Sequence, residues 1–247
     1  MKKSISILVL IALVLISCSK KENPVEPPDD NQPGGNPSGQ PIPTFTGTNN
    51  GVLATISYQQ TVSGFNVDLA VAFAKFGDNG VDAGNVSVNG TAIGKMVSSG
   101  STYYIAPSQT NPVFTLDFNG TAHNWNVQGG SGVTGFTGSV NSPRAFTLTA
   151  PANNATVSKS SGFNVTWSGG TSSKVMIVLA SQSGNGYYAT NELNDNGSFN
   201  ISSANLGNFN GPALLQVVKY NYVSKESGGK NYILVSEIVR SINLTVN

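Results

Sequence analysis

The chain has 247 residues, which is enough for one large or two ordinary domains. Only 10% of the residues are charged, and the formal net charge is +1. Nucleic-acid binding relies on clustered Lys and Arg, and the sequence has no such cluster beyond its N-terminus. Gly, Ser, Thr and Asn are abundant, and they weaken helices but suit strands and tight turns. The composition therefore predicts an all-β protein and excludes nucleic acid as a partner.

The N-terminal residues have the pattern of an export signal. A positive start, Met1-Lys2-Lys3, precedes an apolar stretch at residues 5–16. This stretch of about 12 residues is too short for a membrane span, which needs about 20. Cys18, the only cysteine, follows directly, so the chain cannot form an internal disulfide.

The sequence Leu15-Ile16-Ser17-Cys18 resembles the lipobox of bacterial lipoproteins. The resemblance implies that residues 1–17 are a signal peptide, that cleavage follows Ser17, and that Cys18 is lipidated. A plain secretory signal or an uncleaved anchor is the alternative. More than one acyl chain gives stable membrane attachment. Ser19 stands where an inner-membrane retention signal often has Asp, so we expect a lipid-anchored envelope protein of the outer membrane, on its periplasmic or surface face.

Residues 18–43 are predicted to be the lipidated N-terminus and a disordered tether. The part from Ser19 to Pro43 contains seven prolines and hardly any apolar side chain, so it cannot build a core. Extended polyproline segments rise about 3.1 Å per residue. The tether is therefore expected to hold the folded part away from the membrane.

From residue 44 onward, apolar and polar residues alternate between frequent turn signals, which predicts two antiparallel, Ig-like β-sandwich domains at residues 44–142 and 143–247. In the first domain, the dipeptides Asn89-Gly90 and Asn119-Gly120 indicate type I′ hairpins. Its expected strands are 52–59, 65–76, 84–88, 92–97, 102–106, 113–118, 122–127 and 133–140.

One predicted strand, 65–76, shows the alternation most clearly. Every second residue from Phe65 to Phe73 is large and apolar, which predicts that this face of the strand lies in the core. The intervening residues are smaller, so the other face is expected to be partly covered.

The second predicted domain resembles the Ig-like modules of bacterial surface and secreted proteins. The resemblance lies in Pro151-Ala152-Asn153-Asn154, in 163–169 with Trp167, and in 197–201 followed by Leu206. It implies that Trp167 packs in the core of a sandwich of about seven strands. The expected strands are 145–149, 156–157, 163–167, 174–180, 187–190, 198–201, 213–222 and 232–245.

Candidate catalytic groups are scarce. His123 is the only histidine, and on a strand it shares a face with Trp125, so the two could contact a ligand or simply belong to the sheet. No nucleophile motif lies near His123, and zinc or thiol chemistry lacks ligands. The sequence therefore predicts no catalytic residue, and we expect the protein not to be an enzyme.

Carboxylates and tyrosines supply the remaining candidates. Asp78 with Asp82, and Glu192 with Asp195, are two close pairs that could offer oxygen ligands to calcium or serve only as turn residues. Tyr187 and Tyr188 could stack on a ligand or shield a sheet face.

These observations predict a non-enzymatic envelope lipoprotein whose β-sandwiches bind or space a partner, without a resident cofactor other than the lipid. The expected partners are a membrane through the lipid anchor and a glycan or an envelope protein. An alternative is a carbohydrate-binding or adhesion module that uses exposed tyrosines and calcium. A hydrolase with a carboxylate pair is a further alternative.

Overall fold

The computed structural model describes residues 40–45, 47–62, 65–109, 112–170, 173–183 and 185–247. The signal peptide, Cys18 and the tether up to residue 39 lie outside these residues. The described residues all belong to one compact unit, and nearly all of their regular structure is β. The all-β prediction is therefore confirmed.

Seventeen strands and one short 3-10 helix make up the described part. The strands of the first half are β1 (Gly51–Val62), β2 (Phe65–Phe76), β3 (Val86–Val88), β4 (Thr91–Ala92), β5 (Gly94–Ser98), β6 (Ser101–Ala106), β7 (Ala122–Val127) and β8 (Phe136–Asn141). Those of the second half are β9 (Thr147–Ala150), β10 (Ala155–Val157), β11 (Phe163–Ser168), β12 (Lys174–Ser181), β13 (Tyr187–Ala189), β14 (Leu193–Asn194), β15 (Ser198–Ile201), β16 (Gly211–Ser227) and β17 (Lys230–Val246), with the helix η1 (Ser203–Leu206) before β16.

One ten-stranded sheet runs through both halves of the sequence. Its main order is β13-β12-β16-β17-β1-β2-β6-β5, with β10 beside β17 and β14 beside β12. The prediction of antiparallel sheets throughout is wrong, because β17 pairs in parallel with both β1 and β10. The count of two separate domains is not confirmed, since the last strand of the second half hydrogen-bonds to the first strand of the first half.

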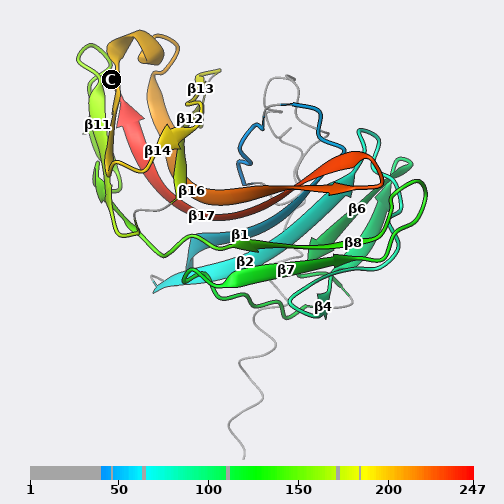
Figure 1. The fold of residues 1–247 in the computed structure, drawn as a ribbon. Coiled ribbons are helices and arrows are strands. Elements are labelled where there is room, and N and C mark those ends of the chain that lie inside the picture. Colours follow the sequence, from blue (N-terminus) through cyan, green and yellow to red (C-terminus); the bar gives the residue numbers. More distant parts are fainter. Residues whose placement is uncertain (1–39, 46, 63–64, 110–111, 171–172, 184) are drawn as a thin grey trace, which may run out of the picture. The chain divides into compact units, whose positions relative to one another are not determined.

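Two smaller sheets cover one face of this large sheet. The four-stranded sheet β4-β3-β7-β8 covers the first half, and the three-stranded sheet β15-β11-β9 covers the second. Figure 1 shows the long β16–β17 hairpin passing through both halves, with β7 and β8 below its right-hand part and β11 beside its left-hand end. The sheets form a β-sandwich in which the large sheet is the layer common to both halves of the sequence.

Each smaller sheet encloses its own hydrophobic core. Trp125, Tyr104 and Phe76 lie in the first core, to which β17 contributes Tyr232 and Leu234. Trp167 lies in the second core, as the Ig-like resemblance implies, among residues of β12, β16 and the far end of β17. The 17 residues of β17 therefore serve both cores.

Several strands and turns differ from the sequence-based expectation. The predicted strand 113–118 is not a strand in the described structure, but Phe114 lies in the first core and Leu116 packs against it. The hairpin at Asn89-Gly90 is confirmed by positive φ at both residues, 48° and 77°, whereas at Asn119-Gly120 only Gly120 has a positive φ.

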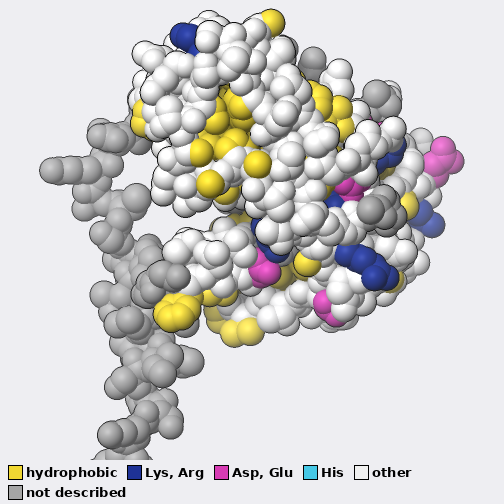
Figure 2. Space-filling model, turned by 90° about the vertical axis from the view of Figure 1, so that its left-hand side faces the viewer, with side chains coloured by type: hydrophobic (Ala, Val, Ile, Leu, Met, Phe, Trp, Pro, Cys, Tyr) yellow, Lys and Arg dark blue, Asp and Glu magenta, His cyan; other side chains and the backbone are white. Residues whose placement is uncertain are grey.

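The alternating residues of β2 lie on the face opposite the smaller sheets. There Val71 and Phe73 are buried in a third apolar cluster, but Phe65 at the strand's start is 76% exposed, so the predicted core face is only half correct. The alternate face of β2, with its alanines, is the one that packs into the first core. Figure 2 shows a patch of hydrophobic side chains on the upper part of this face and a smaller group at its lower left edge.

The third cluster contains an ionisable side chain, Glu237. Ile42 and Phe45 pack over this cluster, and Glu237 of β17 lies within it beside Ile56 of β1 and Tyr220 of β16. Glu237 is fully buried, and neither carboxylate oxygen has a hydrogen-bond partner among the residues that the structure describes. Desolvation raises the pKa of Glu237 well above its ordinary value, so we expect the folded protein to retain this proton.

The shared strand predicts that both cores unfold together. Leu234→Ala should lower the free energy of unfolding by about 3 kcal/mol, because it removes a buried side chain from the first core. Trp125 and Trp167 are the only tryptophans and report one core each, so denaturation can be followed separately in Trp125→Phe and Trp167→Phe backgrounds. Leu234→Ala should shift the midpoint of denaturation by the same amount in the two backgrounds. Val223→Ala, at a 38% exposed position, is the control. A shift confined to Trp125 fluorescence would contradict the prediction.

Glu237 predicts a pH dependence of stability. The unfolded chain releases this proton above a pH of about 4.3, whereas the folded protein keeps it. The free energy of unfolding should therefore fall as the pH rises from about 4.5 through the folded pKa. Glu237→Gln should raise stability at pH 7 by at least about 1 kcal/mol and flatten this slope, as measured by urea denaturation between pH 4 and 8. The exposed Glu226→Gln should leave the slope unchanged, and an unchanged slope in Glu237→Gln would refute the assignment.

Candidate functional site

The outer face of the four-stranded sheet presents a row of uncharged polar side chains. Along β7, His123, Trp125 and Val127 are buried, and the residues between them, Asn124 and Asn126, are exposed. β8 follows the same alternation. The period of two therefore separates a buried set from a displayed set on the same strands.

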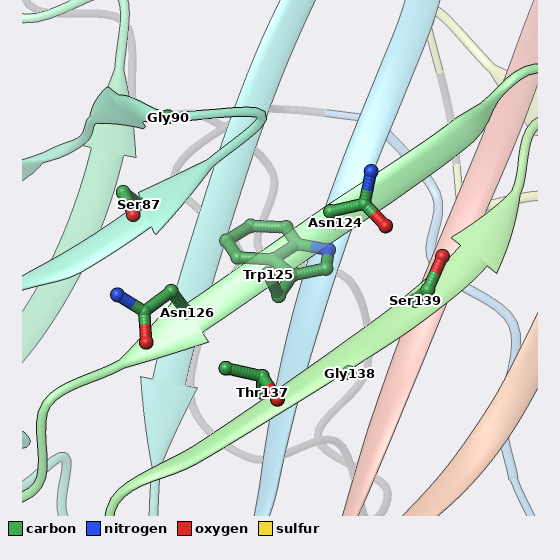
Figure 3. Close-up of a pocket in the computed structure, with 8 residues that line it drawn as sticks. All are labelled: Ser87, Gly90, Asn124, Trp125, Asn126, Thr137, Gly138 and Ser139. Atoms are coloured by element: carbon green, nitrogen blue, oxygen red, sulfur yellow. The ribbon is translucent and has the colours of Figure 1, made fainter.

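The displayed side chains line a shallow hollow of about 440 Å³. Ser87, Asn124, Asn126, Thr137 and Ser139 supply amide and hydroxyl groups, and Gly90 and Gly138 complete the lining with Trp125 at its floor (Figure 3). No lining residue is charged. This volume lies in the range of small-molecule sites, about 300 to 1,000 Å³.

Local packing fixes the shape of this hollow. Gly138 lies opposite Trp125 across the β7–β8 pair, and a Cβ at Gly138 would come within 2.6 Å of Leu234. A larger residue would therefore displace the core beneath. At one edge, Asn89 in the β3–β4 turn accepts a hydrogen bond from the backbone N–H of Asn124 at 2.8 Å, which ties the turn to β7.

His123 and Trp125, which the sequence left as either ligand contacts or ordinary residues of the sheet, point away from the open side of this hollow. His123 is fully buried, and its Nε2 lies 3.1 Å from the carbonyl oxygen of Asp117. A carbonyl only accepts, so Nε2 bears the proton and Nδ1 accepts from the Thr55 hydroxyl at 2.7 Å. Burial lowers the pKa of His123, and the neutral ring fastens β7 to β1 of the large sheet.

Trp125 is only 1% exposed, and its Nε1 has no hydrogen-bond partner in the described structure. Tyr187 and Tyr188 lie elsewhere, on β13 at the edge of the large sheet. Tyr187 is 50% exposed, whereas Tyr188 packs against the second core. The structure thus does not gather the predicted aromatic residues into one surface.

The first pair of calcium candidates, Asp78 and Asp82, have different surroundings. Asp82 receives hydrogen bonds from Lys95 at 3.0 Å, from the backbone N–H of Gly84 and from the Tyr104 hydroxyl, and these lower its pKa. Burial raises the pKa of Tyr104 to about 12. Asp78, by contrast, is exposed and lines a different hollow.

The second pair contacts lysines. Glu192 lies 3.0 Å from Lys174, and Asp195 forms a buried ion pair with Lys219 at 2.5 Å. Trp167 also donates from Nε1 to Asp195 at 2.6 Å. Among the residues that the structure describes, no group of three or more His, Cys, Asp and Glu side chains could hold a metal ion.

A second hollow, also of about 440 Å³, lies on the face of the large sheet that the smaller sheets leave open. Its lining residues are Phe73, Lys75, Asp78, Asn79, Ser99, Gly100, Ser101 and Tyr103. Lys75 and Glu237 lie on this face and were not among the predicted site residues. Each is a charged residue within an apolar strand, and that signal could have identified both.

No described helix is long and apolar enough to cross a membrane. No protein-family model matches the chain, and no curated protein matches it.

Two solved structures are similar to the chain over most of its length. The crystal structure of DIP-gamma IG1+IG2 has 10% sequence identity and a TM-score of 0.19, and the match covers 84% of this chain and 98% of that one. A structure from work on host cell surface retention of a 1.5-MDa bacterial ice-binding adhesin has 12% identity and a TM-score of 0.21, and the match covers 79% of this chain and 65% of that one. The chain thus spans just under two thirds of the adhesin structure. TM-scores this low support no conclusion about function.

Proposed function

We propose that the protein is a non-enzymatic envelope lipoprotein whose β-sandwich binds a neutral glycan at the outer face of the four-stranded sheet. The supporting observation is the hollow lined by amide and hydroxyl groups without a single charge. Sugar hydroxyls both donate and accept hydrogen bonds, as these side chains do. A rigid sheet holds them in place before binding, which lowers the entropic cost of association.

The lining also argues for binding without catalysis. Glycoside hydrolysis needs two carboxyl groups about 5 to 10 Å apart, and neither Asp nor Glu lines this hollow. Calcium would need oxygen ligands of the kind that carboxylates supply. The proposed binding therefore does not depend on calcium or on the exposed tyrosines.

The anchoring part of the proposal rests on the lipobox and the proline-rich tether. Lipid on Cys18 would fix the chain to the outer membrane, and the tether would carry the glycan-binding face away from it. Such a protein would display its binding face in the envelope, on the periplasmic or outer side.

Glycan binding is tested by removing two displayed side chains. In isothermal titration of the full-length chain in detergent with neutral hexose and pentose oligosaccharides, Asn126→Ala/Ser139→Ala should bind at least about tenfold more weakly. Each lost hydrogen bond contributes about 1 kcal/mol, and 1.4 kcal/mol corresponds to a factor of ten. EDTA should change nothing.

The control for this experiment is Asn164→Ala. Asn164 accepts a hydrogen bond from Asn200 on the three-stranded sheet, so the variant loses a comparable amide on another exposed face. Its affinity should equal that of the wild type. The proposed function would be refuted if the wild type bound none of the neutral oligosaccharides, or if the double variant bound them as tightly as the wild type.

Anchoring has its own test. Cells that express the wild-type chain and are fed labelled palmitate should incorporate the label into it, and the chain should sediment with outer membranes. Cys18→Ala removes the acceptor sulfur and should abolish the labelling. Label retained in Cys18→Ala would contradict lipidation at this residue, whatever the result for glycans.

A further inference from the structure

A largely buried lysine side chain lines the second hollow. The Lys75 side chain lies on β2 between Val52 of β1 and Tyr103 of β6, and Lys75 is only 8% exposed. In the described structure it has neither a hydrogen bond nor a carboxylate within 4.0 Å. Burial lowers the pKa of Lys75, while the more distant Asp78 opposes this shift.

Lys219, the other buried lysine among the described residues, has several partners. Its ammonium contacts Asp195 at 2.5 Å and the carbonyl oxygens of Gly169 and Gly170, so several acceptors surround it. Desolvating a charge costs several kcal/mol unless a partner offsets it. Lys75 has no such partner at hydrogen-bond distance among the described residues, and it borders an open hollow in which a ligand would supply the anion.

Two turns build the walls of this hollow. The turn after β2 places Asp78 and Asn79, and Gly80 within it accepts a hydrogen bond from the backbone N–H of Thr102 at 2.9 Å. The β5–β6 turn places Ser99 and Gly100 with φ of 51° and 80°. The turn after β2 is thus hydrogen-bonded to the start of β6, directly after the β5–β6 turn. Backbone contacts therefore hold the two turns at the rim of the hollow.

We propose that this hollow binds the carboxylate of an acidic sugar. Lys75 would pair with the carboxylate, and Ser99, Ser101 and Asn79 would hydrogen-bond the ring hydroxyls. Tyr103 offers an aromatic face beside Lys75 for the ring to stack on. A single cation facing Asp78 suits a singly charged group better than a doubly charged phosphate, which Asp78 would repel.

This second site is independent of the proposed neutral-glycan face. The alternation along β2 turns Lys75 and Phe73 away from the four-stranded sheet, since Ala72, Ala74 and Phe76 are the residues that face it. A variant at either surface should therefore leave the other unchanged, and the two proposals can fail separately.

The test is isothermal titration of the full-length chain in detergent with glucuronate and galacturonate. At least one acid should bind the wild type, and Lys75→Met should weaken that binding at least about tenfold. Lys95→Met should bind normally, because Lys95 is an exposed lysine on β5 that already pairs with Asp82. Lys75→Met should unfold at or above the wild-type temperature, since it removes a buried charge without a partner.

Four results would overturn the proposal: no binding of either acid, unchanged affinity in Lys75→Met, phosphate binding as tightly as the sugar acid, and acetate binding as tightly. The last two would show recognition of an anion without the sugar. If Lys75→Met folds poorly, Asn79→Ala on the exposed turn replaces it. That variant should bind about fivefold more weakly, and unchanged affinity there would also overturn the proposal. The Asn126→Ala/Ser139→Ala variant should bind the acid as the wild type does.

Discussion

The pairing of β17 with strands on both of its sides is the constraint on which the structure depends. β16 runs antiparallel along all 17 residues of β17, and β1 runs parallel along its first half. Because side chains alternate along a strand, a slip of one residue in either pairing would turn Tyr232 and Leu234 out of the first core and Ile238 and Leu244 out of the second. The two cores therefore fix each other's register through a single strand.

Low charge content makes each buried charge informative. Arg240 forms a two-point ion pair with Asp68, at 3.1 and 3.3 Å, and Lys219 pairs with Asp195, so charges on the covered face of the large sheet are matched. On the opposite face, neither Lys75 nor Glu237 has a hydrogen-bond or ion-pair partner among the described residues. Lys75 borders a hollow, which fits the proposed ligand. Glu237 lies beneath an apolar cover, which favours its protonated, neutral form.

Local patterns in the sequence located most strands, because alternation and turn residues act over a few positions. Residues 65–76, 122–127 and 198–201 were predicted with the observed ends, and positive φ at Asn89 and Gly90 followed from the turn chemistry. The parallel β1–β17 pair could not be predicted in this way, since it joins residues about 180 positions apart. The ion pair between Asp195 and Lys219 was not predicted either, because the turn position of Asp195 gave no sign of its partner on β16.

The candidate sites were harder to predict, because the sequence draws attention to rare residues whereas the structure displays common ones. His123 and Trp125 stand out in the sequence, yet both are buried, and His123 joins two sheets. Their unremarkable neighbours Asn124 and Asn126 occupy the displayed face of the same strand. Substitutions there leave the buried set untouched, so one strand can hold a constant core while its outer surface varies. A binding face made of Asn, Ser and Thr therefore fits the same composition that predicted the all-β fold.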